Sequence, residues 1–161
     1  MQICRKYKNQ KFDKGYTMKK IITLLVAFLA MNISALADEI TQDVSKLPES
    51  ARNFISTNFP NAKIAGIEID RNFFFVKDYE TFLSDGTVID FNSRGEMTSV
   101  KNKLTGVPAG LINKNISAYV ASKYPNQKIV SMELKKCCIE IELSSDVDLV
   151  FDCNGNFIKI D

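Results

Sequence analysis

The segment Phe59-Pro60-Asn61-Ala62-Lys63-Ile64 occurs a second time further along the chain, as Tyr124-Pro125-Asn126-Gln127-Lys128-Ile129. An apolar pattern with helical spacing leads into each copy, and an alternating pattern typical of strands follows each copy. Because proline cannot continue a helix, each aromatic-proline pair predicts the end of a helix. Everything after residue 40 is therefore predicted to be an internal duplication of one helix-plus-hairpins unit.

The apolar residues before each copy have the same helical offsets. The first set is Leu47, Ala51, Phe54, Ile55 and Phe59, and the second is Ile112, Ile116, Tyr119, Val120 and Tyr124. Pro48 and Glu49 suit the first turn of a helix, where a missing N–H costs nothing and a carboxylate faces the positive end of the dipole. Two amphipathic helices are expected.

Four alternating apolar stretches follow each helix, separated by polar turns such as Ser84-Asp85-Gly86. We expect an α+β fold of two tandem repeats, each a helix followed by a four-stranded antiparallel sheet, with the helices on one sheet face. The repeats would span 47–100 and 107–161, with 101–106 as linker. The second turn, Ser144-Ser145-Asp146, lacks glycine and is expected to be looser.

Consecutive aromatic residues at 73–75 put apolar groups on both faces of one strand. If the loop around Asp85-Gly86 has three residues, Phe73 and Phe75 face the core. Phe74, Val76 and Phe82 then form an apolar patch on the open face, which we interpret as a candidate partner-binding site. Alternatively, the other repeat or a second copy of the protein covers this face.

The N-terminal region has the form of an export signal. Met18-Lys19-Lys20 precedes an apolar run, and Ala35-Leu36-Ala37 supplies a cleavage pattern, so 18–37 is predicted to be a signal peptide. Residues 1–17 are then an extension upstream of the true start, and 38–46 a flexible lead-in. The apolar run is too short to span a bilayer, so we expect a periplasmic or secreted protein without a membrane span after cleavage.

Residues 38–161 contain 18 acidic and 14 basic side chains without a basic cluster, which does not favour nucleic-acid binding. Five of the acids lie in one predicted hairpin: Glu140, Glu142, Asp146, Asp148 and Asp152. A solvated strand face explains them, although they could favour a basic partner, and a glycosidase-like pair is the less favoured interpretation.

The chain has no histidine, which removes Ser-His-Asp and Cys-His catalysis and the commonest metal ligand. Asp90 to Gly95 superficially resembles the start of a calcium loop, but Arg94 and Lys101 stand where oxygen ligands belong. We therefore expect no enzyme activity, no metal site and no cofactor; carboxylates or Cys138 would be the remaining routes to catalysis.

Cys137 and Cys153 would lie opposite each other in a hairpin centred near Ser145, where an oxidising compartment could join them in a disulfide. If the hairpin is centred on Asp146 instead, Ile139 lies opposite Cys153. The alternative to a disulfide is that Cys137 and Cys153 are two small buried thiols.

The motif from Phe59-Pro60 to Ile64, followed by Tyr79-Glu80 to Gly95, resembles the PepSY-like secreted bacterial domains, which are also described as similar to the beta-lactamase inhibitor protein. A weaker copy runs from Tyr124-Pro125 to Phe157. The resemblance implies an α+β fold with helices over one sheet face, an exported location, and a non-enzymatic binding or inhibitory role.

The leading functional prediction is a protein- or peptide-binding module, inhibitor-like toward an extracytoplasmic hydrolase. The alternative is a small-molecule or lipid-binding envelope module with a cavity between helices and sheet, lined by groups such as Phe54, Phe75 and Tyr119.

Overall fold

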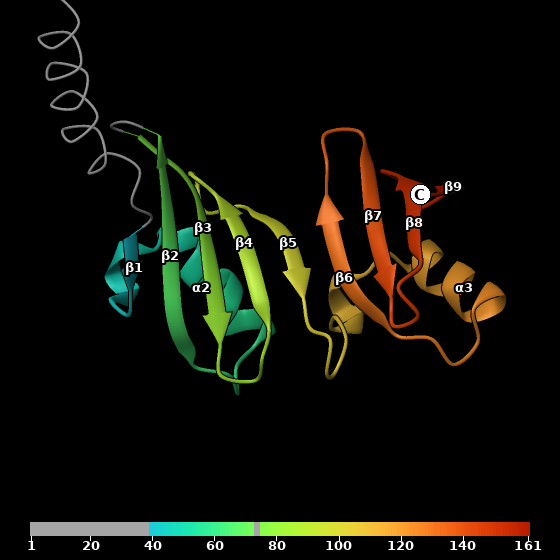
Figure 1. Cartoon of the computed structure of the whole chain (residues 1–161), viewed down its shortest axis with the longest axis horizontal. Helices are drawn as coiled ribbons and strands as arrows, with labels where there is room; N and C mark the ends of the chain where they lie inside the picture. Colours follow the sequence, from blue (N-terminus) through green and yellow to red (C-terminus); the bar gives the residue numbers. More distant parts are fainter. Residues whose placement is uncertain (1–38, 73–74) are drawn as a thin grey trace, which may run out of the picture. The chain divides into compact units, whose positions relative to one another are not determined.

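The computed structural model of the protein describes residues 39–72 and 75–161 (Figure 1). The predicted upstream segment and signal peptide lie outside the described residues. The elements in chain order are β1 (Glu39–Thr41), η1 (Val44–Lys46, a 3₁₀ turn), α2 (Glu49–Asn58), β2 (Ile64–Asn72), β3 (Phe75–Leu83), β4 (Val88–Asn92), β5 (Met97–Lys101), η2 (Ala109–Leu111, also 3₁₀), α3 (Lys114–Lys123), β6 (Ile129–Leu134), β7 (Cys138–Leu143), β8 (Asp148–Asp152) and β9 (Phe157–Ile160).

The described strands form one antiparallel sheet of nine strands, in the order β1 to β9. The prediction of two tandem helix-plus-four-strand repeats is therefore wrong. The strands β5 and β6, which we assigned to different repeats, pair directly from Ser99↔Glu133 to Lys101↔Ser131. Hydrogen bonds along this junction join the two predicted sheets into one, and the predicted linker starts inside β5.

The segment 38–46, which we expected to be flexible, is largely ordered. Its described residues form β1 and η1, and β1 pairs with Ile67–Ile69 of β2 as the first strand of the sheet. Three residues of pairing are too few to give a strong alternating pattern in the sequence.

Both helices end where their sequences predict, but they begin two residues after Leu47 and Ile112, the first residues of the expected helical faces, which follow the two 3₁₀ turns. Pro48 precedes α2, and the Asn113 side chain accepts a hydrogen bond from the Asn115 N–H (2.8 Å) at the start of α3. Phe59 and Tyr124 end the two helices, each donating its N–H to a carbonyl four residues earlier at 2.8 Å. The apolar helical faces enter one hydrophobic core cluster together with the inward residues of the strands.

One uninterrupted row of inward side chains crosses seven strands, because their pairing registers align. It consists of Ile67, Thr81, Ile89, Val100, Met132, Ile141 and Leu149. Each is at most 2% exposed. The continuity of this row places both helices over the same sheet face and explains why a single core forms.

A β-bulge in β3 overturns part of the predicted alternation. Asp70 pairs with Asp78 but Arg71 pairs with Val76, so Lys77 is an extra residue in β3. An extra residue exchanges the two faces of the strand beyond it. Phe75 is consequently 77% exposed, where we expected a core residue, and Val76 packs against the core cluster instead of the open face.

The two hairpin turns that follow β3 and β7 are equivalent, although one has glycine and the other does not. Gly86 has φ +83°, and Asp146 takes φ +58° at the corresponding place. Leu83 N–H bonds to Thr87 O (2.8 Å) and Leu143 N–H to Val147 O (2.9 Å), which closes a three-residue loop in each. The second turn is therefore no looser than the first, since aspartate tolerates the left-handed conformation.

Gly95, in the β4–β5 turn, touches the start of α2. Ser50 Oγ donates a hydrogen bond to Arg94 O (2.7 Å), and a Cβ built on Gly95 would lie 2.4 Å from Ser50 Oγ and 2.6 Å from Pro48 Cβ. With φ at +75°, the position requires glycine for its conformation and for the space.

Candidate functional site

The face of the sheet opposite the helices carries a second aligned row, and this row is polar. Register places Glu68 opposite Glu80, Glu80 opposite Asp90, Asp90 opposite Ser99, and Ser99 opposite Glu133. One row above, Asp70 lies opposite Asp78. Side chains directly opposite on antiparallel strands are close neighbours, so like charges here repel.

These carboxylates line a hollow of about 370 Å³. Its lining residues, which we call the acidic hollow, are Glu68, Asp70, Asp78, Tyr79, Glu80, Asp90 and Thr98. The hollow opens on β2, β3, β4 and β5 and therefore exists only when all four strands are paired.

A lysine neutralises one end of the acidic hollow. The bulge residue Lys77 places its Nζ 2.9 Å from Asp70 Oδ2 and 3.4 Å from Asp78 Oδ2. Both carboxylates raise the pKa of the Lys77 ammonium, the hydrogen bond with Asp70 contributing most. Lysine in the bulge thus compensates two of the five carboxylates.

The other three carboxylates, Glu68, Glu80 and Asp90, form no ion pair with any described residue. We call them the carboxylate row. Desolvation by burial raises the pKa of Glu80 above its usual value, and the charges of Asp90, Glu68 and Asp78 raise it further. Burial also raises the pKa of Asp90, against an opposing hydrogen bond from Ser99. The charge of Lys101 lowers the pKa of Asp90 but does not offset the effect of burial, so the row is a negative site without an ion-pair partner among the described residues.

The acids of the β7–β8 hairpin form more ion pairs with lysines than the carboxylate row does. Lys135 Nζ pairs with Glu140 and Glu133, and Lys103 Nζ lies 3.2 Å from Glu142. Three of the five acids of this hairpin, Glu140, Glu142 and Asp146, thus have a lysine partner, whereas the carboxylate row has none among the described residues.

The predicted patch of Phe74, Val76 and Phe82 is not assembled as expected. Phe82 lies on the open face, where its ring is 3.8 Å from a Cβ built on Gly66. Val76 packs against the core cluster on the other side. Phe74 lies outside the described residues, and Val76 and Phe82 do not share a surface.

The residues expected to line a ligand cavity lie in three different places. Phe54 packs edge-on against Phe91 with ring centroids 5.8 Å apart, and Tyr119 stacks on Phe157 at 4.7 Å. Phe75 is 77% exposed. These contacts place the rings of Phe54 and Tyr119 in packed clusters.

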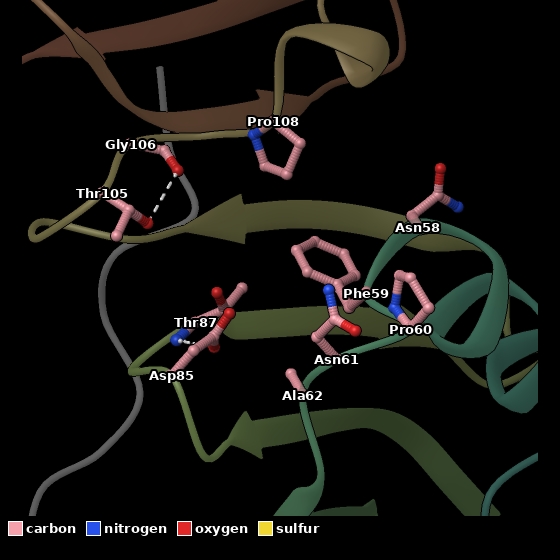
Figure 2. A pocket seen from close by; sticks show the side chains of 10 residues that line it. All are labelled: Asn58, Phe59, Pro60, Asn61, Ala62, Asp85, Thr87, Thr105, Gly106 and Pro108. Atoms are coloured by element: carbon pink, nitrogen blue, oxygen red, sulfur yellow. Dashed lines mark hydrogen bonds between the residues drawn. The ribbon is translucent and has the colours of Figure 1, made fainter.

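A smaller hollow of about 270 Å³ lies where the α2–β2 loop meets the β3–β4 hairpin and the segment before η2 (Figure 2). Asp85 is the only ionisable residue that lines it, and its Oδ1 already accepts from Thr87 N–H (3.0 Å). This hollow offers less unsatisfied polar chemistry than the acidic hollow.

The three described cysteines, Cys137, Cys138 and Cys153, are thiols in the structure. The β7–β8 register has Cys138 opposite Asp152 and Glu142 opposite Asp148, which centres the hairpin on Ser145. Continued by one residue, this register faces Cys137 toward Cys153, and both are exposed turn residues. Their oxidation remains a prediction.

Sequence reasoning missed the carboxylate row. Its signal was present, since Glu68, Glu80 and Asp90 each occupy an outward position beside an inward apolar residue. Their alignment could not be recognised without the pairing registers of three strands.

A family comparison agrees with this architecture. The model of the family described as "Putative beta-lactamase-inhibitor-like, PepSY-like" matches residues 33–80 and 77–159. The chain belongs to this family. The predicted resemblance is thereby confirmed, and nothing in the family description points to catalysis.

Three solved structures from Bacteroides species are similar to this chain. One, from Bacteroides vulgatus and described as "a putative periplasmic protein of unknown function", is 34% identical, with TM-score 0.72 over 78% of this chain and 99% of that chain. Another, from Bacteroides thetaiotaomicron and described as "a putative calcium-regulated periplasmic protein", is 32% identical, with TM-score 0.70 over 77% and 96%. A second Bacteroides vulgatus protein, also described as periplasmic, is 33% identical, with TM-score 0.68 over 77% and 96%.

The predicted periplasmic or exported location is confirmed by these neighbours. No helix in residues 39–72 and 75–161 is long and apolar enough to cross a membrane. Within the same ranges, no group of three or more Cys, Asp or Glu residues has the arrangement of a metal site. A comparison of the chain with curated proteins found no match.

Proposed function

We propose that the protein is a periplasmic binding module that holds a basic segment of a protein or peptide in the acidic hollow. The carboxylate row carries this proposal, because Glu68, Glu80 and Asp90 are adjacent, partly buried and without an ion pair to any described residue. A lysine or arginine side chain from a partner would supply the missing charge.

The energetic argument rests on mutual repulsion. Each carboxylate in the row raises the free energy of its neighbours, and an incoming cation removes that repulsion and gains charge-assisted hydrogen bonds. Such complementarity contributes to association rate and specificity and weakens as salt increases. Phe82 lies on the same face and offers an apolar contact beside the charges.

We further propose that the partner is an extracytoplasmic hydrolase whose activity the protein inhibits. The family description as beta-lactamase-inhibitor-like and the periplasmic neighbours support this proposal. An inhibitor needs a rigid surface, and a face built from paired strands over one packed core provides it.

The first test uses a defined probe, a fluorescein-labelled Lys-Val-Lys-Val-Lys peptide, with fluorescence anisotropy as the readout. We expect Glu68→Gln/Glu80→Gln to weaken binding by about tenfold, which corresponds to about 1.4 kcal/mol. The control Glu49→Gln/Glu96→Gln removes the same charge from α2 and the β4–β5 turn and should change the affinity by less than twofold. Equal weakening by both pairs would show a non-specific effect of net charge and contradict the proposal.

The second test identifies the partner. A pull-down from periplasmic extract with the native protein and with Glu68→Gln/Glu80→Gln should recover a hydrolase with the native protein alone, and the recovered enzyme should lose activity when the native protein is added. Because one neighbour is described as calcium-regulated, each measurement is made with and without Ca²⁺. A recovered hydrolase that stays fully active would refute the inhibitory role.

A further inference from the structure

Among the described residues, no strand pairs with the outer edge of the sheet beside the start of β2. Strand β1 is the first strand of the sheet and pairs only with Ile67–Ile69. Ile64 and Gly66 of β2 pair with Leu83 and Phe82 of β3, with Ala65 as a bulge residue between them, and no described strand lies on their other side. An edge with unpaired N–H and C=O groups is a template for another extended chain.

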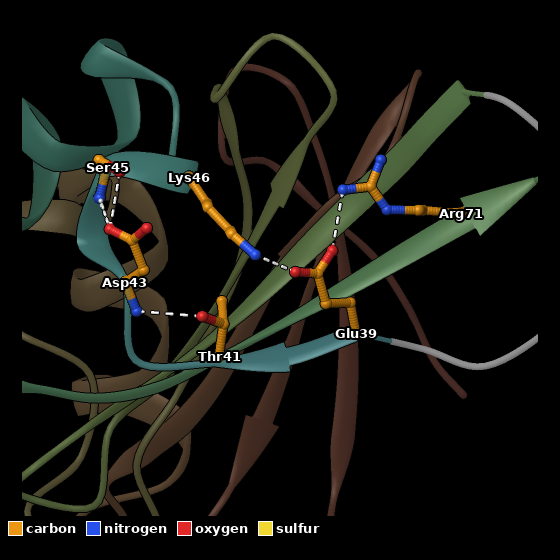
Figure 3. A network of polar contacts seen from close by, with 6 residues as sticks. All are labelled: Glu39, Thr41, Asp43, Ser45, Lys46 and Arg71. Atoms are coloured by element: carbon orange, nitrogen blue, oxygen red, sulfur yellow. Dashed lines mark hydrogen bonds and ion pairs between the residues drawn. The ribbon is translucent and has the colours of Figure 1, made fainter.

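Side chains fix the point where the chain leaves this edge (Figure 3). Thr41 Oγ1 accepts a hydrogen bond from Asp43 N–H (3.1 Å), and Asp43 Oδ1 accepts from Ser45 N–H (3.0 Å) and Ser45 Oγ (2.7 Å). Glu39 forms ion pairs with Lys46 and with Arg71, the latter at 3.0 Å. These contacts hold the turn between β1 and η1, and Val44 of η1 lies beside Ile64 in the lining of a hollow.

A hollow of about 520 Å³ lies beside the open edge. Its lining residues, which we call the edge groove, are Val44, Arg52, Ile55, Ser56, Phe59, Pro60, Ala62, Lys63 and Ile64. Most of them are apolar, and Val44 is 39% exposed. The groove lies between α2 and the beginning of β2, so an apolar side chain in it would contact the rim of the core.

The charge of the groove is opposite to that of the acidic hollow. Arg52 and Lys63 are its charged residues, both are exposed, and neither forms an ion pair with a described residue. A ligand that suits the site is extended, apolar at alternate positions and negatively charged.

We propose that an acidic polypeptide segment adds to β2 at Ile64–Gly66 as an extra strand and inserts an apolar side chain into the edge groove. Main-chain hydrogen bonds provide affinity in such strand addition, and pockets for alternate side chains provide specificity. The carboxylates of the segment pair with Arg52 and Lys63. This second surface is independent of the acidic hollow and goes beyond the proposed function.

The test selects peptides from a displayed library of random octapeptides on the purified protein. The counter-selection uses Ser56→Trp, since Ser56 is exposed and a tryptophan there would fill the groove without changing the core. We expect peptides that are enriched on the native protein alone, with net negative charge and with valine, isoleucine or an aromatic residue at alternate positions.

The strongest peptide is then synthesised and titrated by fluorescence anisotropy. We expect Arg52→Glu/Lys63→Glu to weaken its binding by about tenfold or more. The control Lys114→Glu/Lys123→Glu reverses the same charge on α3 and should leave the affinity within about twofold. Methylation of alternate peptide nitrogens should abolish binding, because it removes the main-chain donors needed for strand addition.

Three outcomes would overturn the inference: no enrichment, equal enrichment on Ser56→Trp, or unchanged binding by Arg52→Glu/Lys63→Glu. Enrichment of basic peptides that lose affinity with Glu68→Gln/Glu80→Gln would support the acidic hollow and refute the edge groove. Enrichment of acidic peptides with the expected variant effects would support the edge groove. This conclusion would hold whether or not the acidic hollow binds basic peptides.

Discussion

Thr81 is the one polar side chain in the inward row, and its replacement by valine should stabilise the protein. Thr81 is 0% exposed and lies opposite Ile67 and Ile89, which are also 0% exposed. Its Oγ1 has no hydrogen-bond partner among the described residues. Valine has nearly the same shape and replaces the hydroxyl with a methyl group.

The expected gain follows from the cost of a buried, unsatisfied polar group, about 1 to 3 kcal/mol. For a domain of this size each kcal/mol corresponds to about 3 to 6 °C in the melting temperature. Thr81→Val should therefore raise the melting temperature by several degrees and raise the urea midpoint without changing the slope of the transition.

Thr87→Val is the control, and it is expected to change the stability in the opposite direction. It is 1% exposed, but its Oγ1 accepts a hydrogen bond from Asn102 Nδ2 at 2.9 Å. Thr87→Val leaves that buried amide with only a longer contact to Asp85 O (3.4 Å) and should destabilise the protein by about 1 to 2 kcal/mol. Thr81→Ser, which keeps the hydroxyl and removes the methyl group, should also destabilise it.

The measurement is urea unfolding followed by far-UV circular dichroism, with calorimetry for the melting temperature. A Thr81→Val protein no more stable than the native one would refute the reasoning, because it would mean that the Thr81 hydroxyl is satisfied. Destabilisation by both valine variants would place a hydrogen-bond partner at each hydroxyl.

Three further predictions concern pH, a turn and the cysteines. The pKa values of Glu80 and Asp90 are raised in the folded state, so these two groups bind protons more readily in the fold than in the unfolded chain. Their contribution to stability, measured by urea unfolding as the difference between the native protein and Glu80→Gln/Asp90→Asn, should increase as the pH falls from 7 toward about 4. Gly95→Ala should destabilise the protein by about 2 kcal/mol or more in the same assay, since the added Cβ would overlap the start of α2 and φ is positive. Oxidised glutathione should join Cys137 to Cys153, with loss of two hydrogens in intact mass and a stabilisation of about 3 kcal/mol for a loop of this length.

Each of these predictions has a control that separates it from a general effect. Glu80→Gln should remove part of the gain at lower pH, and an unchanged pH profile in this variant would contradict the role of Glu80. Gly110→Ala should be nearly neutral, because nothing lies within 4 Å of a Cβ built there. Cys138→Ser should still lose two hydrogens, and a disulfide that requires Cys138 would refute the Cys137–Cys153 pairing.

The family and the local elements could be predicted from sequence to a large extent. The motif beginning at Phe59-Pro60 identified the family, and the helical spacing before it predicted α2 and α3 with their ends at Phe59 and Tyr124. These features depend on neighbours within a few residues along the chain, where proline, capping and periodicity act directly.

The site depended on residues that are distant in sequence. The carboxylate row joins Glu68, Glu80 and Asp90 from three strands, and a single slip in register would separate them. Val76 does not lie on the open face as predicted for the patch of Phe74, Val76 and Phe82, because the bulge at Lys77 exchanges the two faces of β3 beyond it.

The sequence alone thus determined the family, the exported location, the two helices and the alternation of inward and outward residues, because local periodicity and turn chemistry encode them. The tertiary structure decided that β5 pairs with β6 in one sheet of nine strands and that β1 pairs with β2 only at Ile67–Ile69. It also decided that the carboxylates of three strands meet in one hollow. These outcomes are set by strand registers and bulges, which depend on how well distant faces pack together and have no local signature in the chain.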